Sequence, residues 1–397
     1  MSPEYLFTLV VALLPVAALS GWLVGRRDGG TTRGARSHGP VAGLSNDYIR
    51  GLNFLLNDRP DKAIEVFIKA IEVESETVET HLALGNLFRR RGEVDRAIRI
   101  HQNIVARPSL EFDQRALALL ELGLDYMRSG LLDRAESLFK ELLESGAHQR
   151  QAIDHLVDIY QQERDWGKAI EYTERLEKLG NSDLRDRRAH FLCEQADALL
   201  AEGDVEEASA RLRLALTVDE KCVRASLMQA RLAMTAGAYE AAIRHLQRIE
   251  TQNIAFLSEA VMPLVECYRN LNRIPELVIY LERLGALHSG VTPNLMLAQM
   301  LCELHGIEAA KQCIVTELKQ RPTVRGIDRL IAYSLVGAQG EAHESLFLLK
   351  DVTTRLIEQK LNYMCGNCGF KGRSLHWHCP SCKSWNSVKP IHGIEGE

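Results

Sequence analysis

Small and apolar side chains recur at fixed intervals from Leu44 onward. Gly51 is followed by such residues at offsets of 3, 12, 16 and 19 positions, and the series starts again from Gly85, 34 residues later. The first two copies are Gly51-Phe54-Ala63-Phe67-Ala70 and Gly85-Phe88-Ala97-His101-Ile104. Residues three or four apart share one face of a helix, so the spacing predicts two amphipathic helices in each 34-residue unit.

Further copies follow in the same register and match fewer positions after Leu271. They read Leu122-Gly123-Tyr126-Ala135-Phe139, Tyr160-Ala169, Leu199-Ala208-Leu212, Ala233-Ala242-Leu246, Tyr268-Leu277-Leu281 and Leu301-Ala310-Ile314, with a last copy through Leu335 and Leu348. Unit length and the order of small and aromatic residues are those of the tetratricopeptide repeat. The sequence therefore predicts an all-α solenoid of eight to nine repeats over residues 44–355, a fold that offers a surface for peptides or proteins.

The recurring small residues predict close packing of the two helices in each repeat, with the large residues filling the space beside them. Turn-forming residues stand where the helices of a pair should be joined: Asn57-Asp58 before Pro60, Gly92, Gly130, Gly203-Asp204 and Gly237. Arg89, Arg90 and Arg91 end one predicted helix. This basic run has two interpretations, a contact for an acidic partner or a solvated turn.

The N-terminal region carries an uncharged segment of 21 residues, Tyr5–Gly25. As a helix it would be about 31 Å long, close to the hydrocarbon thickness of a bilayer. A cleaved signal peptide would need positive charge before this segment, but Glu4 precedes it and Arg26 and Arg27 follow it. We therefore predict an uncleaved anchor over residues 1–27 with its C-terminal side in the cytoplasm, followed by a Gly-rich linker over residues 28–43.

Composition changes this picture little. Lys and Arg number 48 against 53 Asp and Glu, a formal charge of −5 that disfavours nucleic acid as a partner. Nine cysteines occur. Five stand singly in helical patterns and are expected to be small buried residues: Cys193, Cys222, Cys267, Cys302 and Cys313.

The other four cysteines form two Cys-x2-Cys pairs, Cys365 with Cys368 and Cys379 with Cys382. Two such turns facing one another place four thiolates in a tetrahedron. Two disulfides are the alternative, which a reducing cytoplasm disfavours. We expect one metal ion, zinc or iron, since both suit four sulfur ligands.

Several neighbours bear on this site. Gly369 supplies a positive φ for the first turn, and Pro380 stiffens the second. His376 and His378 are left out of the ligand set because four thiolates complete it. Trp377 and Trp385 are expected to cover the small core of the site.

The order of anchor, repeats and cysteine tail resembles the lipopolysaccharide assembly protein B family over essentially the whole chain. The most specific stretches are GWLVGRR, HLALGNLFRRRGEVDRAIRIHQ and LHWHCPSCKSWNSVKP. The resemblance implies a rubredoxin-like metal-binding domain over residues 361–392, with Cys365, Cys368, Cys379 and Cys382 as ligands and the tail packed against the repeats. It also implies a single-pass protein of a Gram-negative inner membrane whose bulk is cytoplasmic.

The same resemblance implies an adaptor that regulates lipopolysaccharide synthesis. Such a protein presents the UDP-3-O-acyl-N-acetylglucosamine deacetylase, which commits precursor to lipid A, to the membrane protease FtsH, and contacts other lipopolysaccharide assembly and inner-membrane proteins. Homo-oligomerisation stays open.

An enzyme is not expected. His343-Glu344 begins an H-E-x-x-H pattern, but Phe347 replaces the second histidine, and no phosphate loop or nucleophile elbow occurs. The alternative function is a membrane-tethered rubredoxin-type electron carrier, because the same cysteine spacing holds iron in rubredoxins.

Overall fold

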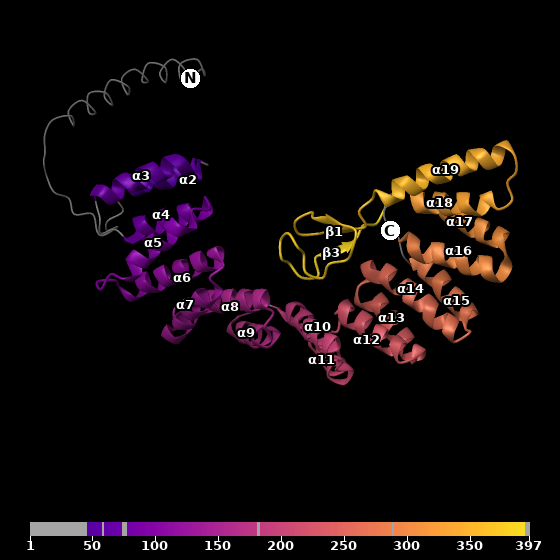
Figure 1. The fold of residues 1–397 in the computed structure, drawn as a ribbon, viewed down its shortest axis with the longest axis horizontal. Coiled ribbons are helices and arrows are strands. Elements are labelled where there is room, and N and C mark those ends of the chain that lie inside the picture. The colour runs from indigo at the N-terminus through magenta and orange to yellow at the C-terminus, as the bar shows by residue number, and fades with distance from the viewer. Residues whose placement is uncertain (1–45, 58, 74–77, 181–182, 288–289, 394–397) are drawn as a thin grey trace, which may run out of the picture. The chain divides into compact units, whose positions relative to one another are not determined.

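The computed structural model describes residues 46–57, 59–73, 78–180, 183–287 and 290–393 (Figure 1). Two compact units divide the chain, residues 1–87 and 88–397. The predicted anchor at 1–27 and the predicted linker at 28–43 lie outside the described residues. Among those that are described, no helix combines the length and apolar character needed to cross a bilayer.

Helices follow one another from the first described residue to Glu358. The earlier ones are α2 (Asn46–Leu56), α3 (Pro60–Val73), α4 (Val78–Arg90), α5 (Val94–Val105), α6 (Phe112–Ser129), α7 (Leu132–Ser145), α8 (Gln149–Glu163), α9 (Trp166–Leu179) and α10 (Arg185–Glu202). The later ones are α11 (Val205–Val218), α12 (Val223–Thr235), α13 (Tyr239–Gln252), η1 (Ile254–Phe256), α14 (Leu257–Asn270), α15 (Ile274–Leu287), α16 (Val291–His305), α17 (Ile307–Gln320), α18 (Val324–Leu335) and α19 (Glu341–Glu358). In the first unit α2 packs on α3, and in the second each helix from α5 to α19 packs on the next.

The predicted small positions lie at the centre of the helix pairs. Ala63, Ala97, Ala135, Ala169, Ala208 and Ala242 are fully buried, as are their large partners Phe67, Phe139 and Leu212. The weaker copies keep the same placement, since Leu277, Leu281 and Ala310 are also fully buried. This burial confirms the tetratricopeptide solenoid.

Gly123 shows why the pattern requires a small residue. A Cβ atom at this position would lie 2.6 Å from the Phe139 ring, well inside van der Waals contact. In the first unit a Cβ at Gly51 would lie 2.5 Å from the Phe67 ring. The aromatic ring of one helix therefore packs directly on the backbone of its partner, at a glycine that has no side chain.

The turns within the pairs share one hydrogen-bonding pattern. Gly130 has a φ of +78°, and the next residue, Leu131, donates its N–H to the Tyr126 carbonyl at 2.9 Å. Gly92, Gly203 and Gly237 also have positive φ, which confirms them as turn residues. Arg164 and Asn272 adopt the same left-handed conformation in repeats that lack the glycine.

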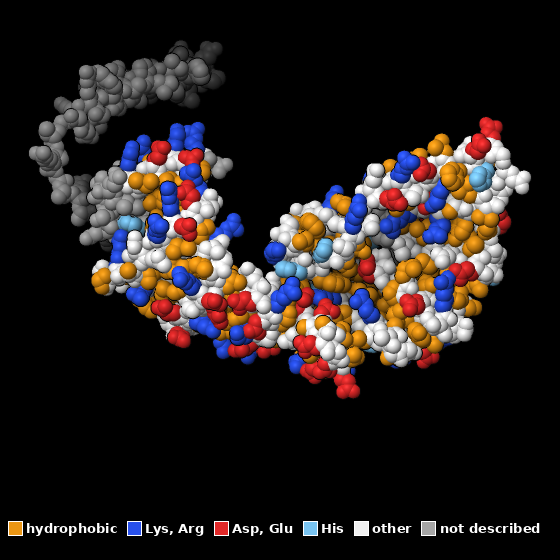
Figure 2. Space-filling model, in the orientation of Figure 1, with side chains coloured by type: hydrophobic (Ala, Val, Ile, Leu, Met, Phe, Trp, Pro, Cys, Tyr) orange, Lys and Arg blue, Asp and Glu red, His pale blue; other side chains and the backbone are white. Residues whose placement is uncertain are grey.

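The final pair departs from the pattern. Leu335 is half-buried in α18, but Leu348 in α19 is 64% exposed. None of the side chains of α19 is buried. On the face shown in Figure 2, acidic and basic side chains are interspersed over the helices.

Arg89 is half-buried in the second unit and pairs with two carboxylates of α6, so both interpretations of the basic run were wrong for this residue. Its guanidinium lies 2.8 Å from Asp125 Oδ1 and 2.6 Å from Glu121 Oε2. Asp125 Oδ2 lies 2.5 Å from His101 Nδ1, and Asp125 and His101 are both fully buried. His101 occupies the position that Phe139 takes one repeat later, so a polar network replaces an aromatic contact there.

We expect Gly123→Ala to destabilise the second unit by about 1–3 kcal/mol, because the new methyl group overlaps the Phe139 ring. Urea denaturation followed by circular dichroism measures the loss. Gly337→Ala is the matched control, since nothing lies within 4 Å of its Cβ position, and it should change stability by less than about 0.5 kcal/mol. Equal midpoints for the two variants would contradict this account of the helix contact.

Candidate metal centre and its seat on the repeats

The residues after α19 form a small antiparallel sheet. Its strands are β1 (Tyr363–Cys365), β2 (Lys371–Gly372) and β3 (Val388–Pro390), in the order β2-β1-β3. Met364 pairs with Lys371 on one side and with Lys389 on the other. The sheet holds the first cysteine turn between β1 and β2, and a bridge between His378 and Trp385 closes the second turn.

The two cysteine turns are built alike. Gly369 N–H donates to the Cys365 carbonyl and Lys383 N–H donates to the Cys379 carbonyl, each at 3.0 Å. The N–H of each first cysteine in turn bonds the carbonyl five residues later. Gly369 has a φ of +76°, as predicted, and Lys383 takes the equivalent position at +59° without being a glycine. Backbone N–H groups therefore fix the direction of both cysteine pairs.

The four Sγ atoms lie within 4.8 Å of one another. Cys365 and Cys382 are 3.7 Å apart at sulfur, as are Cys368 and Cys379. A tetrahedron with metal–sulfur bonds of about 2.3 Å has edges of about 3.8 Å, so the spacing fits a four-coordinate ion. The cysteines are thus clustered to hold one metal ion.

Hydrogen bonds and burial prepare the thiols unequally. The Ser384 side chain and backbone lower the pKa of Cys382 to about 5, and the Ser387 hydroxyl lowers the pKa of Cys365. Burial raises the pKa of Cys379 to about 11. Only thiolates bind a metal, so an ion must displace the proton of this innermost cysteine.

Trp377 and Trp385 do not cover the cysteines, which corrects the sequence-based expectation. The core of the module consists of Cys365, Cys379 and Val388 with Tyr363, Phe370, Leu375 and Cys382 beside them. Both indole rings instead pack on helices of the second unit. The module uses its two largest apolar side chains to attach itself to the repeats.

His190 of α10 lies between the two indole rings. Its ring centroid is 5.2 Å from that of Trp385 and 5.8 Å from that of Trp377. Trp385 also meets Phe191 edge-on at 5.7 Å, and Trp377 stacks on Phe256 of η1 at 5.2 Å. We call the surface of the repeats that contacts the module its seat. Through His190 of α10 and Phe256 of η1, the seat joins two elements that are separated by three helices of the array.

Polar contacts fix the orientation of the module. Gln161 of α8 accepts a hydrogen bond from Trp385 Nε1 at 2.9 Å, and its Nε2 lies 3.1 Å from His378 Nε2. Asn386 donates to Asp186 at 3.2 Å. Farther along the array, the Tyr363 hydroxyl donates to Glu259 of α14 at 2.7 Å.

Comparison with known proteins gives the family. The chain is 41% identical over 389 residues to lipopolysaccharide assembly protein B of Escherichia coli K12, covering 98% of this chain and 99% of the relative. It is 37% identical to the protein of the same name from Haemophilus influenzae, with the same two coverages. The chain belongs to the lipopolysaccharide assembly protein B family.

Matches to family models agree with this assignment. A family model described as a rubredoxin metal binding domain matches residues 363–390. Tetratricopeptide repeat models match residues 80–111 and 193–254. A solved tetratricopeptide-repeat structure, YrrB, aligns with 52% of this chain and 99% of its own at 18% identity and a TM-score of 0.33. The relatives of this lipopolysaccharide assembly protein B family member do not favour the electron-carrier alternative.

Sequence reasoning found the four cysteines of this family member, and the packing of the tail against the repeats, which the resemblance implied, is confirmed. The residues that make this contact were missed. Gln161 and His190 stand in helical patterns with nothing local to mark them, and both matter only because the tail returns to them. His376 and His378 lie outside the sulfur cluster. His378 instead stacks on Trp385 at 4.6 Å.

Among the five other cysteines, the expected burial is confirmed for three, while Cys302 and Cys313 are half-buried. Two of these cysteines lie close together in space, although they stand far apart in the sequence. Cys193 of α10 and Cys222, which precedes α12, approach to 3.9 Å at sulfur. Their proximity follows from the stacking of neighbouring repeats.

We expect Trp385→Ala to release the module from the repeats while leaving one metal ion per chain, because the indole lies outside the core around the cysteines. The free energy of unfolding should fall by about 2 kcal/mol, less than for removal of a fully buried Trp, because Trp385 is half-buried. Hydrogen exchange at residues 183–191 and elemental analysis measure the two effects. Phe347→Ala, which removes a 63% exposed ring, is the control and should change neither. Metal loss in Trp385→Ala would contradict the division between core and seat.

Proposed function

We propose that this protein is an inner-membrane adaptor that regulates lipopolysaccharide synthesis by presenting the lipid A-committing deacetylase to FtsH. The observation that carries the proposal is family membership over 98% of the chain. An array of helix pairs supports it, because such arrays bind other proteins along extended surfaces. Other lipopolysaccharide assembly and inner-membrane proteins are further partners in this proposal.

The proposed organisation has four parts. Residues 1–27 anchor the chain as a single-pass helix, and residues 28–43 form the linker. Residues 44–355 form the repeat array on the cytoplasmic side, and residues 361–392 form the metal-binding domain. The 21 uncharged residues from Tyr5 to Gly25, followed by Arg26 and Arg27, support this placement.

We further propose Cys365, Cys368, Cys379 and Cys382 as the ligands of one zinc or iron ion. Sulfur–sulfur distances of 3.7 Å support this assignment. The ion contributes folding energy here, since so small a module has little apolar burial of its own. Its role in the adaptor is to keep the module in shape to bind the repeats.

The contact between the module and its seat also restrains the packing angles of the repeats. In a repeat array each unit contacts mainly its neighbours, so small changes in packing angle accumulate along the chain. The module touches Gln161 in α8 and Glu259 in α14, which lie 98 residues apart in the sequence. A folded module therefore holds these repeats at one set of angles, and with them any partner surface they form.

Anchoring adds a second physical effect. A tether confines the array to the membrane plane in which a membrane protease works, and this raises the effective concentration of a captured substrate. No new contact is needed for that gain. The repeats supply recognition, the metal module supplies rigidity and the anchor supplies proximity.

We expect Cys379→Ser to lose the metal and the seat together, so that regulation fails through misfolding of the tail. Elemental analysis, thermal unfolding and the cellular level of the deacetylase measure this. Cys302→Ser is the matched control, because Cys302 lies outside the sulfur cluster in a half-buried position. Full metal content with normal regulation in Cys379→Ser would refute the bracing role.

A form lacking residues 1–27 should keep its fold and lose most activity. Its test is the half-life of the deacetylase in cells whose own copy of the gene is deleted. The control carries an unrelated transmembrane helix in place of residues 1–27 and should restore degradation if proximity is what the anchor supplies. Full complementation by the untethered form at ordinary expression would refute the tethering argument, and an unchanged half-life after gene deletion would refute the adaptor proposal itself.

A further inference from the structure

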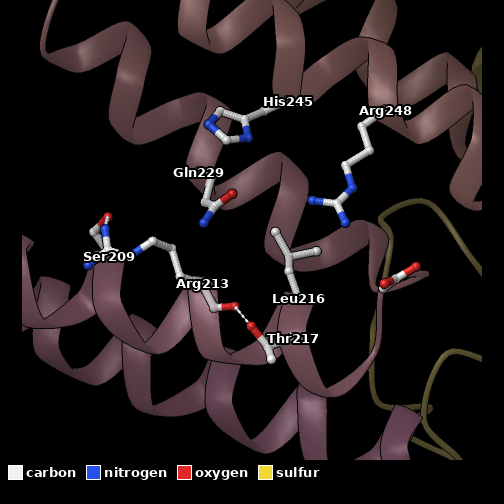
Figure 3. A pocket seen from close by; sticks show the side chains of 8 residues that line it. Ser209, Arg213, Leu216, Thr217, Gln229, His245 and Arg248 are labelled. Carbon is white, nitrogen blue, oxygen red and sulfur yellow. Dashed lines mark hydrogen bonds between the residues drawn. The ribbon is translucent and has the colours of Figure 1, made fainter.

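A pocket of about 520 Å³ opens between α11, α12 and α13, away from the four cysteines (Figure 3). It is lined by Ser209, Arg213, Leu216, Thr217, Glu220, Gln229, His245 and Arg248. The lining is mostly polar, and its volume lies in the range of small-molecule sites. None of these residues belongs to the seat of the metal module.

Two arginines face this pocket without a carboxylate partner. In the part of the chain that the structure describes, neither Arg213 nor Arg248 forms an ion pair. Arg213 donates to the Ser209 hydroxyl at 2.9 Å. Nearby arginines differ, since Arg211 lies 2.6 Å from Glu207 and Arg224 lies 2.7 Å from Glu194. The two guanidinium groups of the pocket are therefore available to an anion.

Gln229 provides an independent indication of a ligand. Its side chain is only 7% exposed, and its Oε1 atom has no hydrogen-bond partner. Figure 3 shows the amide facing the space into which Arg248 extends. A buried amide oxygen without a donor is unfavourable, so a group that donates a hydrogen bond at this point would be stabilised.

Besides the two arginines, the pocket is lined by two further ionisable side chains, His245 and Glu220. Burial lowers the pKa of His245, and the positive charges of Arg244 and Arg248 lower it further, so the imidazole is neutral at pH 7. Glu220 is a lining carboxylate and opposes an anion. The pocket thus has two positive groups, one negative group and one buried acceptor.

We propose that this pocket binds a phosphate monoester. Guanidinium groups pair with phosphate oxygens through two parallel hydrogen bonds. A phosphate that is protonated on one oxygen keeps a hydroxyl that can donate to Gln229, whereas a carboxylate offers no donor. The site is separate from the proposed adaptor function and does not depend on it.

The metal-loaded full chain in nanodiscs is titrated calorimetrically with inorganic phosphate, glycerol 3-phosphate and acetate. Both phosphates should bind, and acetate should bind at least tenfold more weakly. Dihexanoyl phosphatidic acid, a short lipid with the same group, forms a further arm. If it binds tighter than glycerol 3-phosphate the natural ligand is a lipid phosphate, and if weaker it is a soluble ester.

Arg248→Gln should weaken phosphate binding by roughly tenfold to a hundredfold, the usual effect of losing a charged hydrogen bond. Arg248→Lys keeps the charge but loses the planar fork, so its loss should be smaller. Glu220→Gln should bind phosphate more tightly than the parent. Arg211→Gln is the matched control, because it removes the same charge from α11 without lining the pocket.

Three results would each overturn the proposal: no binding of either phosphate at millimolar concentration, equal affinity for acetate and phosphate, or equal losses in Arg248→Gln and Arg211→Gln. Thermal unfolding without phosphate checks that each variant is folded. If Arg248→Gln fails this check, Arg213→Gln takes its place, because the Arg213 side chain is exposed.

Discussion

The indole rings of Trp377 and Trp385 pack, half-buried, against the repeats, and the placement of the tail depends on this contact. A module of about thirty residues has a small apolar core. When its largest apolar side chains pack on the repeats instead, burial alone cannot stabilise the module. The four-sulfur cluster compensates for this, because metal–sulfur bonds stabilise the module in place of apolar burial. In return, His190 between the two rings gains contacts that no neighbouring repeat offers. Metal binding and the packing of the repeats are therefore linked through Trp377 and Trp385, two side chains that are not metal ligands.

The repeats show how far periodicity reaches as a source of prediction. Spacing located Ala135 and Phe139 in the core, since a helix pair can be packed only when a small residue faces a large one. It did not locate Arg164 or Lys383, which adopt left-handed conformations usually given to glycine. At these positions hydrogen bonds of the surrounding turn impose the backbone geometry on an ordinary residue. The direction of Trp385 was missed for a related reason, because its partner Gln161 is 224 residues away in the sequence.

Polar residues inside the array follow a different rule from the apolar ones. His101 stands at an aromatic position, and the fold accommodates it by adding Asp125 and Arg89 as a connected network. Such a network tolerates loss of a single member poorly, because the remaining charge stays buried without its partner. The repeat pattern locates the position of His101, but only the structure shows which residues of the next helix complete it. Degeneracy of a repeat is thus compensated by specific contacts and need not weaken the packing.

The phosphate pocket and the metal module act on the same stretch of the array. The module is attached at α10 and again at η1 and α14, and the pocket is formed by α11, α12 and α13 between these two points. A ligand held by Arg213 of α11 and Arg248 of α13 would favour one spacing of the helices between the attachment points. The attached module also favours one spacing, since both of its contact sites must be reached at once. Ligand binding and attachment of the module therefore both depend on the spacing of the same helices. By linkage, each changes the equilibrium of the other by the same factor. Occupancy of the pocket and attachment of the module would therefore either support or oppose one another, through helices that contain neither a metal ligand nor a residue of the seat.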